Sequence, residues 1–309
     1  MCVTPNLALD RALLVPGFEC GGVWRAEEVR ITAGGKGLNV ARMLARLDRP
    51  SSVVGLLGGS TGERITALTA AAGVRAHWTR IRGETRTSVI LADGRGGSTV
   101  INEPGPTIGE EEWGRFVGDV GRLAVDAACV VISGSLPPGT PPGAIRCLIA
   151  AAKTVPVWVD SSSNALADAI AARVHGLKVN ATEVAAVVGG RVSGTADALR
   201  AAAAVRQRGV GRVAITLGAA GAVLLDGDGA WEAMSPTVEV RNAVGSGDCF
   251  LAGLVAAFDR GEGAETALRL ATACGSANAT SIGVVDVDPA LVRALMPQVT
   301  LRRVAFPSA

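Results

Sequence analysis

The sequence predicts an α/β fold of three layers, in which a mostly parallel β-sheet is covered by helices on both faces. Short apolar runs bounded by Gly, Pro or Asp are typical of buried strands, and they alternate with longer Ala-, Leu- and Arg-rich segments of helical spacing. Such alternation favours right-handed β-α-β units, which make consecutive strands parallel. Strands are expected at 52–57, 129–133, 155–160, 177–180 and 213–217, and helices at 38–47, 63–72, 142–152, 195–208 and 264–280.

Two regions depart from this alternation. Residues 11–32 and 85–103 alternate polar and apolar side chains, and a Gly-rich turn lies at 94–97. This pattern predicts antiparallel strands with one face in contact with the protein, here a small β lid beside the main sheet. The chain is long enough for one large core, so residues 1–309 are expected to form a single domain that includes the lid.

Composition excludes several classes of protein. The net charge of +2 gives no basic excess for nucleic acid or a membrane surface. The two histidines, His77 and His175, are far apart, which argues against a zinc site or a Ser-His triad. Six cysteines are scattered without a C-x-x-C pair, as in proteins of reducing compartments. Because the first residues carry no basic segment, a cytoplasmic protein is expected.

The segment Asn242–Asp248 carries the strongest chemical signal. Its glycines permit a tight turn in which the amides of Gly245, Ser246 and Gly247 can point into one concavity. The apolar run that follows predicts a helix, and a helix N-terminus attracts anions. Asp248 would then be a base that deprotonates an alcohol while the amides hold a transferring phosphate. A simple capping aspartate after a glycine turn explains this motif alone equally well.

A second glycine-rich motif, Ala33–Asn39, opens a predicted helix. Gly34 and Gly35 allow close approach of the backbone to a ligand, Lys36 adds a cation, and Asn39 lies in the first helical turn. The motif is not a P-loop, and no G-x-G-x-x-G fingerprint follows the first predicted strand. Taken alone, the motif is more typical of a flexible turn with a solvated lysine.

Eight motifs, in order along nearly the whole chain, resemble the phosphofructokinase-B (ribokinase-like) family of sugar kinases. The resemblance is greatest to the branch with 1-phosphofructokinases and tagatose-6-phosphate kinases. It implies a three-layer ribokinase-like fold with a β lid, and an ATP-dependent kinase that uses Mg²⁺. The matching segments are 4–10, 34–41, 85–87, 101–106, 133–139, 180–183, 216–222 and 245–248.

The resemblance assigns the catalytic and nucleotide-binding roles. Asp248 would be the catalytic base, and the amides of Gly245, Ser246 and Gly247 would hold the phosphoryl group in flight. Glu183 would position Mg²⁺ and its waters. The residues expected along ATP are Lys178, Asn180, Thr216, Gly218 and Gly221, and the 264–280 helix would form part of the adenine wall.

The resemblance also assigns the sugar side. Asp10 would bind substrate hydroxyls, together with Gly34, Gly35, Asn39 and Ser135. Lys36 and Arg86 would meet the phosphate of a sugar phosphate, because a guanidinium and an ammonium suit that anion. Arg25 is a further candidate for this phosphate, although a solvated arginine explains it as well. The expected reaction converts fructose 1-phosphate or tagatose 6-phosphate to the bisphosphate.

Three alternatives stay open on the sequence. The nearest is a ribokinase-like kinase of an unphosphorylated sugar or nucleoside, which Lys36 and Arg86 disfavour. The second is a non-catalytic nucleotide- or sugar-binding regulator, and the third is a dinucleotide-dependent oxidoreductase on a similar sheet.

Only small-molecule partners and a second copy of the chain are expected, without nucleic acid or membrane. The homodimer is expected through the lid, where Val15, Phe18, Val23 and Trp24 would be exposed together.

Overall fold

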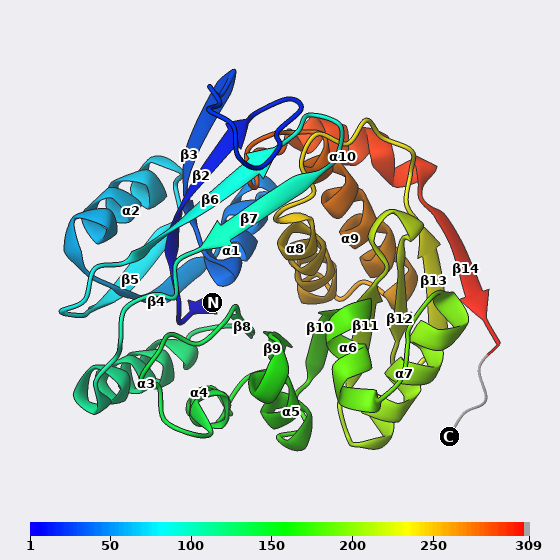
Figure 1. Cartoon of the computed structure of the whole chain (residues 1–309). Coiled ribbons are helices and arrows are strands. Elements are labelled where there is room, and N and C mark those ends of the chain that lie inside the picture. Colours follow the sequence, from blue (N-terminus) through cyan, green and yellow to red (C-terminus); the bar gives the residue numbers. More distant parts are fainter. Residues whose placement is uncertain (306–309) are drawn as a thin grey trace.

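The computed structural model describes residues 1–305, which form a ten-stranded sheet, a four-stranded sheet and the helices around them (Figure 1). The strands are β1 Cys2–Thr4, β2 Ala8–Leu14, β3 Glu28–Gly34, β4 Ser52–Leu57, β5 Arg75–Arg80, β6 Arg86–Ala92, β7 Ser98–Asn102, β8 Val130–Ser133, β9 Val157–Asp160, β10 Gly176–Asn180, β11 Arg212–Thr216, β12 Ala222–Leu225, β13 Ala230–Met234 and β14 Thr300–Val304. The helices are α1 Lys36–Arg46, α2 Gly59–Ala71, α3 Glu110–Ala124, α4 Ala144–Ala151, α5 Ser163–Ala171, α6 Ala181–Val188, α7 Thr195–Gln207, α8 Ser246–Asp259, α9 Ala264–Ala279 and α10 Pro289–Leu295.

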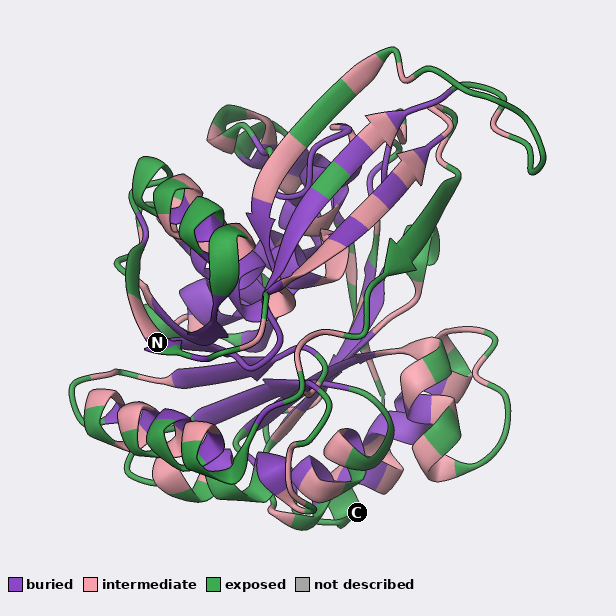
Figure 2. Cartoon of the chain, turned by 60° about the vertical axis from the view of Figure 1, so that its left-hand side comes forward, coloured by how far each residue is buried: buried purple, intermediate pink, exposed green. Residues whose placement is uncertain are grey.

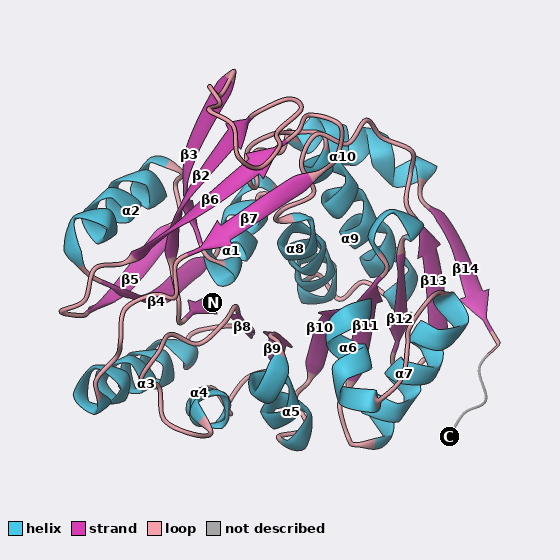
Figure 3. Cartoon of the chain, viewed as in Figure 1, coloured by secondary structure: helices cyan, strands magenta, loops and turns pink. Residues whose placement is uncertain are grey.

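The large sheet confirms the predicted α/β class. Its strand order is β14-β13-β12-β11-β10-β9-β8-β1-β4-β5. All neighbours from β5 to β11 pair in parallel, whereas β12, β13 and β14 add an antiparallel edge. The five strands and five helices expected from the sequence all occur, with ends within a few residues of the expected ones (Figure 3).

Two hydrophobic cores lie on the two faces of this sheet. Because side chains alternate along a strand, neighbouring residues such as Val53 and Val54 belong to different cores. One core packs α1, α8 and α9 on the sheet, and the other packs the helices from α3 to α7 (Figure 1). The three layers expected from the sequence are therefore present. No helix among residues 1–305 is long and apolar enough to span a bilayer.

The four-stranded sheet is the lid, with the order β3-β2-β6-β7. Its outer pairs, β2–β3 and β6–β7, are antiparallel as expected, but the central pair β2–β6 is parallel. The chain leaves the lid after β3 and passes through the main-sheet strands β4 and β5, so it returns for β6 in the direction of β2. Strands also cover less of the first lid region than expected, because residues 15–27 form the loop that connects β2 to β3.

The register gives the lid two chemically different faces. Asp10, Ser88 and Asn102 are paired across β2, β6 and β7 and therefore lie on one face, which is the inner face. The opposite, outer face carries partly exposed aliphatic side chains in adjacent rows: Leu13, Val29, Ile31, Val89, Leu91 and Ile101. Buried and more exposed positions alternate along the lid strands (Figure 2).

The prediction that four apolar residues of the lid are exposed together is partly wrong. Val23 is 99% exposed and Trp24 43%, but Val15 is only 4% exposed. The amide of Val15 donates to the carbonyl of Ala92, which continues the pairing beyond β2 and keeps Val15 against the protein. The outer apolar face is made mainly by strand residues.

Candidate active site

A cavity of about 1040 Å³ lies between the inner face of the lid, the carboxyl ends of the parallel strands and the start of α8. In open α/β sheets this edge is the usual place for a ligand. Every site residue expected from the sequence lines the cavity except Gly34 and the further candidate Arg25. A Cβ atom on Gly34 would lie 2.1 Å from Oδ2 of Asp10, so this glycine makes room for the carboxylate. Arg25 is exposed on the 15–27 loop and does not line the cavity.

The start of α8 forms an anion-attracting turn. Gly245 is the N-cap with φ of 86°, a left-handed conformation that favours glycine. Its carbonyl accepts hydrogen bonds from the amides of Asp248 and Cys249, both at 3.0 Å. The amide of Ser246 donates to Ala243 at 3.1 Å, so it is less available to a ligand than expected. Within residues 1–305 the amides of Gly245 and Gly247 make no backbone hydrogen bond, and these two donors remain open.

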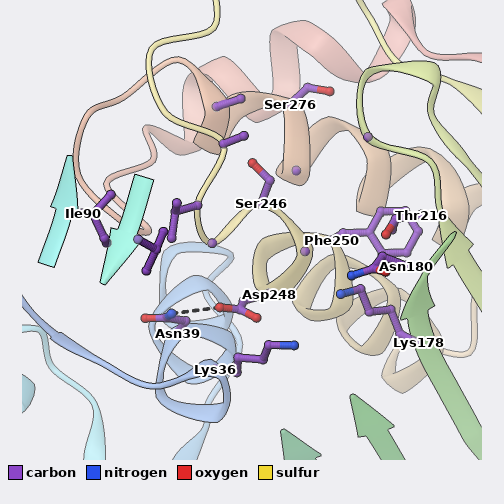
Figure 4. Close-up of a pocket in the computed structure, with 18 of the residues that line it drawn as sticks. Lys36, Asn39, Ile90, Lys178, Asn180, Thr216, Ser246, Asp248, Phe250 and Ser276 are labelled. Atoms are coloured by element: carbon purple, nitrogen blue, oxygen red, sulfur yellow. Dashed lines mark hydrogen bonds between the residues drawn. The ribbon is translucent and has the colours of Figure 1, made fainter. Parts of the chain in front are cut away.

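Asp248 lies in the first turn of α8 and is buried. Its Oδ2 accepts a hydrogen bond of 2.8 Å from Nδ2 of Asn39 on α1 (Figure 4). Burial raises the pKa of Asp248 to about 6, while Lys36 is the largest of the groups that oppose this rise. A carboxylate with this pKa is largely ionised at neutral pH and is still basic enough to accept a proton from an alcohol in a transition state.

Asp160 is a site residue that the sequence reasoning missed. It lies fully buried at the end of β9, where Oδ1 is 3.1 Å from Nζ of Lys36 and Oδ2 is 2.9 Å from Nζ of Lys178. Burial by itself would raise the pKa of Asp160, but the two ammonium groups hold it below its usual value. An aspartate at the carboxyl end of a predicted buried strand was the signal that could have identified it.

The two lysines thereby acquire fixed positions. Nζ of Lys36 also lies 3.7 Å from Oε1 of Glu183, so this ammonium is directed toward β9 and α6. Asp160 is the main reason that the pKa of Lys36 is raised, and Lys36 therefore stays charged. Nζ of Lys178 lies 2.6 Å from the position that a Cβ atom on Gly247 would occupy, so it borders the turn at α8.

Asn180 and Glu183 form a capping box at the start of α6. The amide of Asn180 donates to Oε2 of Glu183, and the amide of Glu183 donates to Oδ1 of Asn180, both at 2.8 Å. This pairing leaves Oε1 of Glu183 facing Lys36. Within residues 1–305 no cluster of three acidic, His or Cys side chains could hold a metal by itself. One carboxylate fits Mg²⁺ that is shared with substrate phosphates and waters, which is how this ion commonly binds.

The loop between β11 and β12 forms another wall. Gly218 and Gly221 adopt φ of 62° and 107°, and a Cβ atom on Gly221 would lie 1.9 Å from the carbonyl oxygen of Ala233. These glycines let the backbone after Thr216 fold tightly beside the cavity. Opposite this loop, the expected wall from α9 is present, and its lining residues are Thr272, Gly275, Ser276 and Ala279.

The lid side of the cavity contains Asp10 and Arg86. Burial raises the pKa of Asp10 to about 7, although Arg42 and Arg86 oppose this rise. Arg86 donates through Nη1 to the carbonyl of Glu103 at 3.0 Å, while its buried Nε has no partner within residues 1–305. Asn6, which the sequence reasoning also missed, donates to Ser135 at 3.2 Å and leaves its buried Oδ1 unpaired. A ligand with both donors and acceptors could satisfy these atoms.

A basic carboxylate at an open helix start, fixed cations and a polar lid define an α/β phosphotransferase of a small hydroxylated substrate. A family model described as "pfkB family carbohydrate kinase" matches residues 4–291, and the chain belongs to this family of carbohydrate kinases.

Comparisons with individual proteins agree with this membership. The chain is 36% identical to the 1-phosphofructokinase of Rhodobacter capsulatus, over 97% of this chain and 96% of that protein. It is 32% identical to the 1-phosphofructokinase of Escherichia coli K12, over 97% of both. Among solved structures, phosphofructokinase-2 from Escherichia coli in complex with substrates and products matches with a TM-score of 0.88 and 27% identity, over 96% of this chain and 97% of that one. The resemblance stated from the eight motifs is confirmed.

Proposed function

We propose that the chain transfers the γ-phosphoryl group of ATP to a hydroxyl of a ketohexose phosphate, with fructose 1-phosphate as the first candidate. The observation that carries this proposal is the position of Asp248, a buried basic carboxylate beside two open amides in a cavity that also contains Asp10 and Arg86. The names of the curated relatives, 1-phosphofructokinases, favour fructose 1-phosphate over tagatose 6-phosphate.

Asp248 would act as the general base. Because Asn39 holds Oδ2, the free oxygen Oδ1 is the one to accept the proton of the sugar hydroxyl. The hydroxyl oxygen forms a bond to the γ-phosphorus as the bond to the ADP oxygen breaks. The amides of Gly245 and Gly247 would stabilise the charge on the transferring group, which is usually a larger effect than the proton transfer.

Lys36 and Lys178 would bind phosphate oxygens of ATP. The sequence resemblance assigned Lys36 to the sugar phosphate, but its contacts with Asp160 and Glu183 support a role beside the transferring phosphoryl group. Asp160 holds both ammonium groups beside the cavity through its two oxygens, and it raises the pKa of Lys36. Mg²⁺, when bound beside Glu183, would supply further positive charge against the phosphates.

Arg86 would recognise the phosphate that the sugar already carries. Its buried, unpaired Nε is a donor that a phosphate oxygen can satisfy. Asn6 lies beside this guanidinium, since its carbonyl oxygen is 3.5 Å from Nη2 of Arg86. An unphosphorylated sugar would leave this donor without a partner, which is costly in a buried site.

We also infer that two copies of the chain pair through the outer face of the lid. The aliphatic side chains in adjacent rows on β2, β3, β6 and β7 form a surface that a second identical lid could cover.

The test is release of ADP with ATP, Mg²⁺ and a panel of acceptors. The panel contains fructose 1-phosphate, fructose 6-phosphate, tagatose 6-phosphate, and free fructose, tagatose and ribose. We expect turnover with a ketohexose phosphate, a loss of kcat of about 10²- to 10⁴-fold in Asp248→Asn, and a raised KM for the sugar phosphate in Arg86→Met. Turnover only with a free sugar, unchanged by Arg86→Met, would contradict the assigned substrate class. No turnover with any acceptor would contradict the proposed activity.

A further inference from the structure

Arg42 is a charged residue close to the active site that does not line the cavity. It lies on α1, one turn after Asn39, and its side chain points back along the helix. Nη1 donates to the carbonyl of Ala33 at 3.1 Å and lies 3.5 Å from Oδ1 of Asn39. The backbone contact fixes the guanidinium, and the second contact places a positive charge against the amide oxygen of Asn39.

Asn39 connects this cation to the catalytic base. Its Oδ1 faces Arg42, while its Nδ2 donates to Oδ2 of Asp248 at 2.8 Å. We propose that Arg42 is a positioning residue that orients the amide of Asn39, so that Asn39 donates to Asp248 and holds it as an ionised base. This inference rests on the proposed function, in which Asp248 accepts the proton.

The physical reason is the asymmetry of an amide group. If the amide of Asn39 were rotated by half a turn, its oxygen would face the carboxylate of Asp248 and its NH₂ group would face the guanidinium of Arg42. Both contacts would then be repulsive, so Arg42 favours the observed orientation. Without Arg42, the rotated amide becomes accessible when Asp248 is protonated, since the carboxylic acid can donate to Oδ1. Loss of Arg42 therefore favours the protonated, inactive base.

Other charges around these groups do not select the orientation of the amide. The ionisable groups whose charges act on Asp248 come from four elements, and they are Lys36, Asp160, Lys178 and Asp10. They act on the carboxylate in either amide orientation. The groups whose charges act on Arg42 are Asp10, Arg46, Cys249 and Asp286. Asp10 is attractive and shares this environment, because Arg42 is the largest influence that opposes the raised pKa of Asp10.

The test compares pH profiles of kcat/KM for the wild type, Arg42→Met and Arg42→Lys. We expect Arg42→Met to shift the acidic limb upward by about one pH unit, the equivalent of about 1.4 kcal/mol and of one hydrogen bond to a charged group. Activity should largely return at high pH, and Arg42→Lys should restore most of the shift because it keeps the charge. Arg46→Met is the matched control on the same helix, where the side chain is exposed, and it should leave the limb in place.

A structural role for Arg42 would have another signature. Arg42→Met would then lower activity by the same factor at every pH, with an unshifted limb, and this result would overturn the proposal. If Arg42→Met does not fold, Arg42→Lys and Arg42→Gln provide the comparison, with and without charge. In an Asn39→Ala background, a persistent shift on removal of Arg42 would also overturn it, because the effect would not pass through Asn39. A wild type without any kinase activity would contradict the proposed function, and with it the role of Arg42 that rests on that function.

Discussion

At the scale of single residues, burial decides the chemistry of the two aspartates in the cavity. Asp10 and Asp248 are both less than a tenth exposed, and the pKa of each is raised by burial, to about 7 and about 6 respectively. The charge of Asp248 also raises the pKa of Asp10, and the charge of Asp160 raises the pKa of Asp248. Each negative charge therefore makes the ionisation of its neighbour less favourable. Burial therefore moves the ionisation of both aspartates from the acidic range toward neutral pH.

The first prediction concerns the pH dependence of the reaction. Because Asp248 must be ionised to accept a proton, activity should fall as the pH decreases through about 6. The acidic limb of the profile of kcat/KM for the sugar phosphate should therefore lie near that value. The limb should be absent from the residual activity of Asp248→Asn, whereas Asp259→Asn, at the exposed end of the same helix, should retain it. A limb near the ordinary aspartate value of about 4 would contradict this assignment.

The second prediction concerns stability. In the folded protein the pKa of Asp10 lies above its ordinary value, so the folded state binds this proton more tightly than the unfolded chain. The stability associated with Asp10 is greatest at low pH and is lost as the pH rises through about 7. Asp10→Asn cannot ionise and should therefore have a Tm above that of the wild type at pH 8.5. The difference should become smaller at pH 5, as measured by thermal unfolding; a difference independent of pH would count against a raised pKa.

At the scale of elements, the lid is held to the loop that precedes α8 by a few defined contacts. Oγ of Ser98 on β7 donates to Oδ1 of Asn242 at 2.9 Å. The same oxygen accepts the amide of Val244 at 3.0 Å, and Nδ2 of Asn242 donates to the carbonyl of Ile282 at 2.8 Å. Arg241 and Glu28 of β3 add an ion pair of 3.7 Å. Asn242 therefore joins the lid to the loop that leads into α8.

The third prediction follows from this connection. Ser98→Ala removes the hydrogen bond from the lid and should raise KM for the sugar phosphate about fivefold, since one such bond contributes about 1 kcal/mol. A lid that closes less firmly should also admit water, so hydrolysis of ATP without sugar should increase relative to transfer. Thr99→Ala, on the outer face of the same strand, is the control. Equal effects of the two changes would show that the contact with Asn242 has no special role.

At the scale of the whole molecule, the lid has a polar face toward the cavity and an aliphatic face away from it. Its outer aliphatic residues include Val29, 48% exposed, and Ile101, 58% exposed, which lie in adjacent rows of the sheet. Large apolar residues exposed together on one surface are uncommon in monomers. Since the same side chains are present on every copy, a two-fold pairing of lids is the simplest way to cover them.

The fourth prediction is a dimer at micromolar concentration that depends on this face. Val29→Lys combined with Ile101→Lys should convert the dimer to a monomer, because each lysine would have to lose its hydration in the interface. Sedimentation velocity measures the change. Val125→Lys is the control, because Val125 is 68% exposed at the end of α3, far from the lid in sequence. A wild type that sediments as a monomer would contradict the proposed pairing.

Much of the fold could be predicted because it depends on local patterns. The period of apolar residues identified strands and helices, and their alternation identified the parallel sheet. The order of eight short motifs was sufficient to identify the family, which the match over residues 4–291 confirms. The parallel pairing of β2 with β6 could not be predicted in this way, because it depends on where the chain returns after it has left the lid. The buried position of Val15 likewise depends on its pairing with Ala92.

The sequence by itself determined the α/β class, the family and a set of candidate site residues that nearly all line the cavity, because glycine-rich turns and strand ends carry their chemistry in a few adjacent positions. Only the tertiary structure decided how these groups act on one another. Asp160 meets Lys36 and Lys178 across 124 and 18 residues of chain, and Asn39 meets Asp248 across 209. The pKa of a carboxyl group depends on its burial and on the charges near it in space. Neither quantity is a property of sequence spacing, and both become defined when α1, β9, β10 and α8 converge on the cavity.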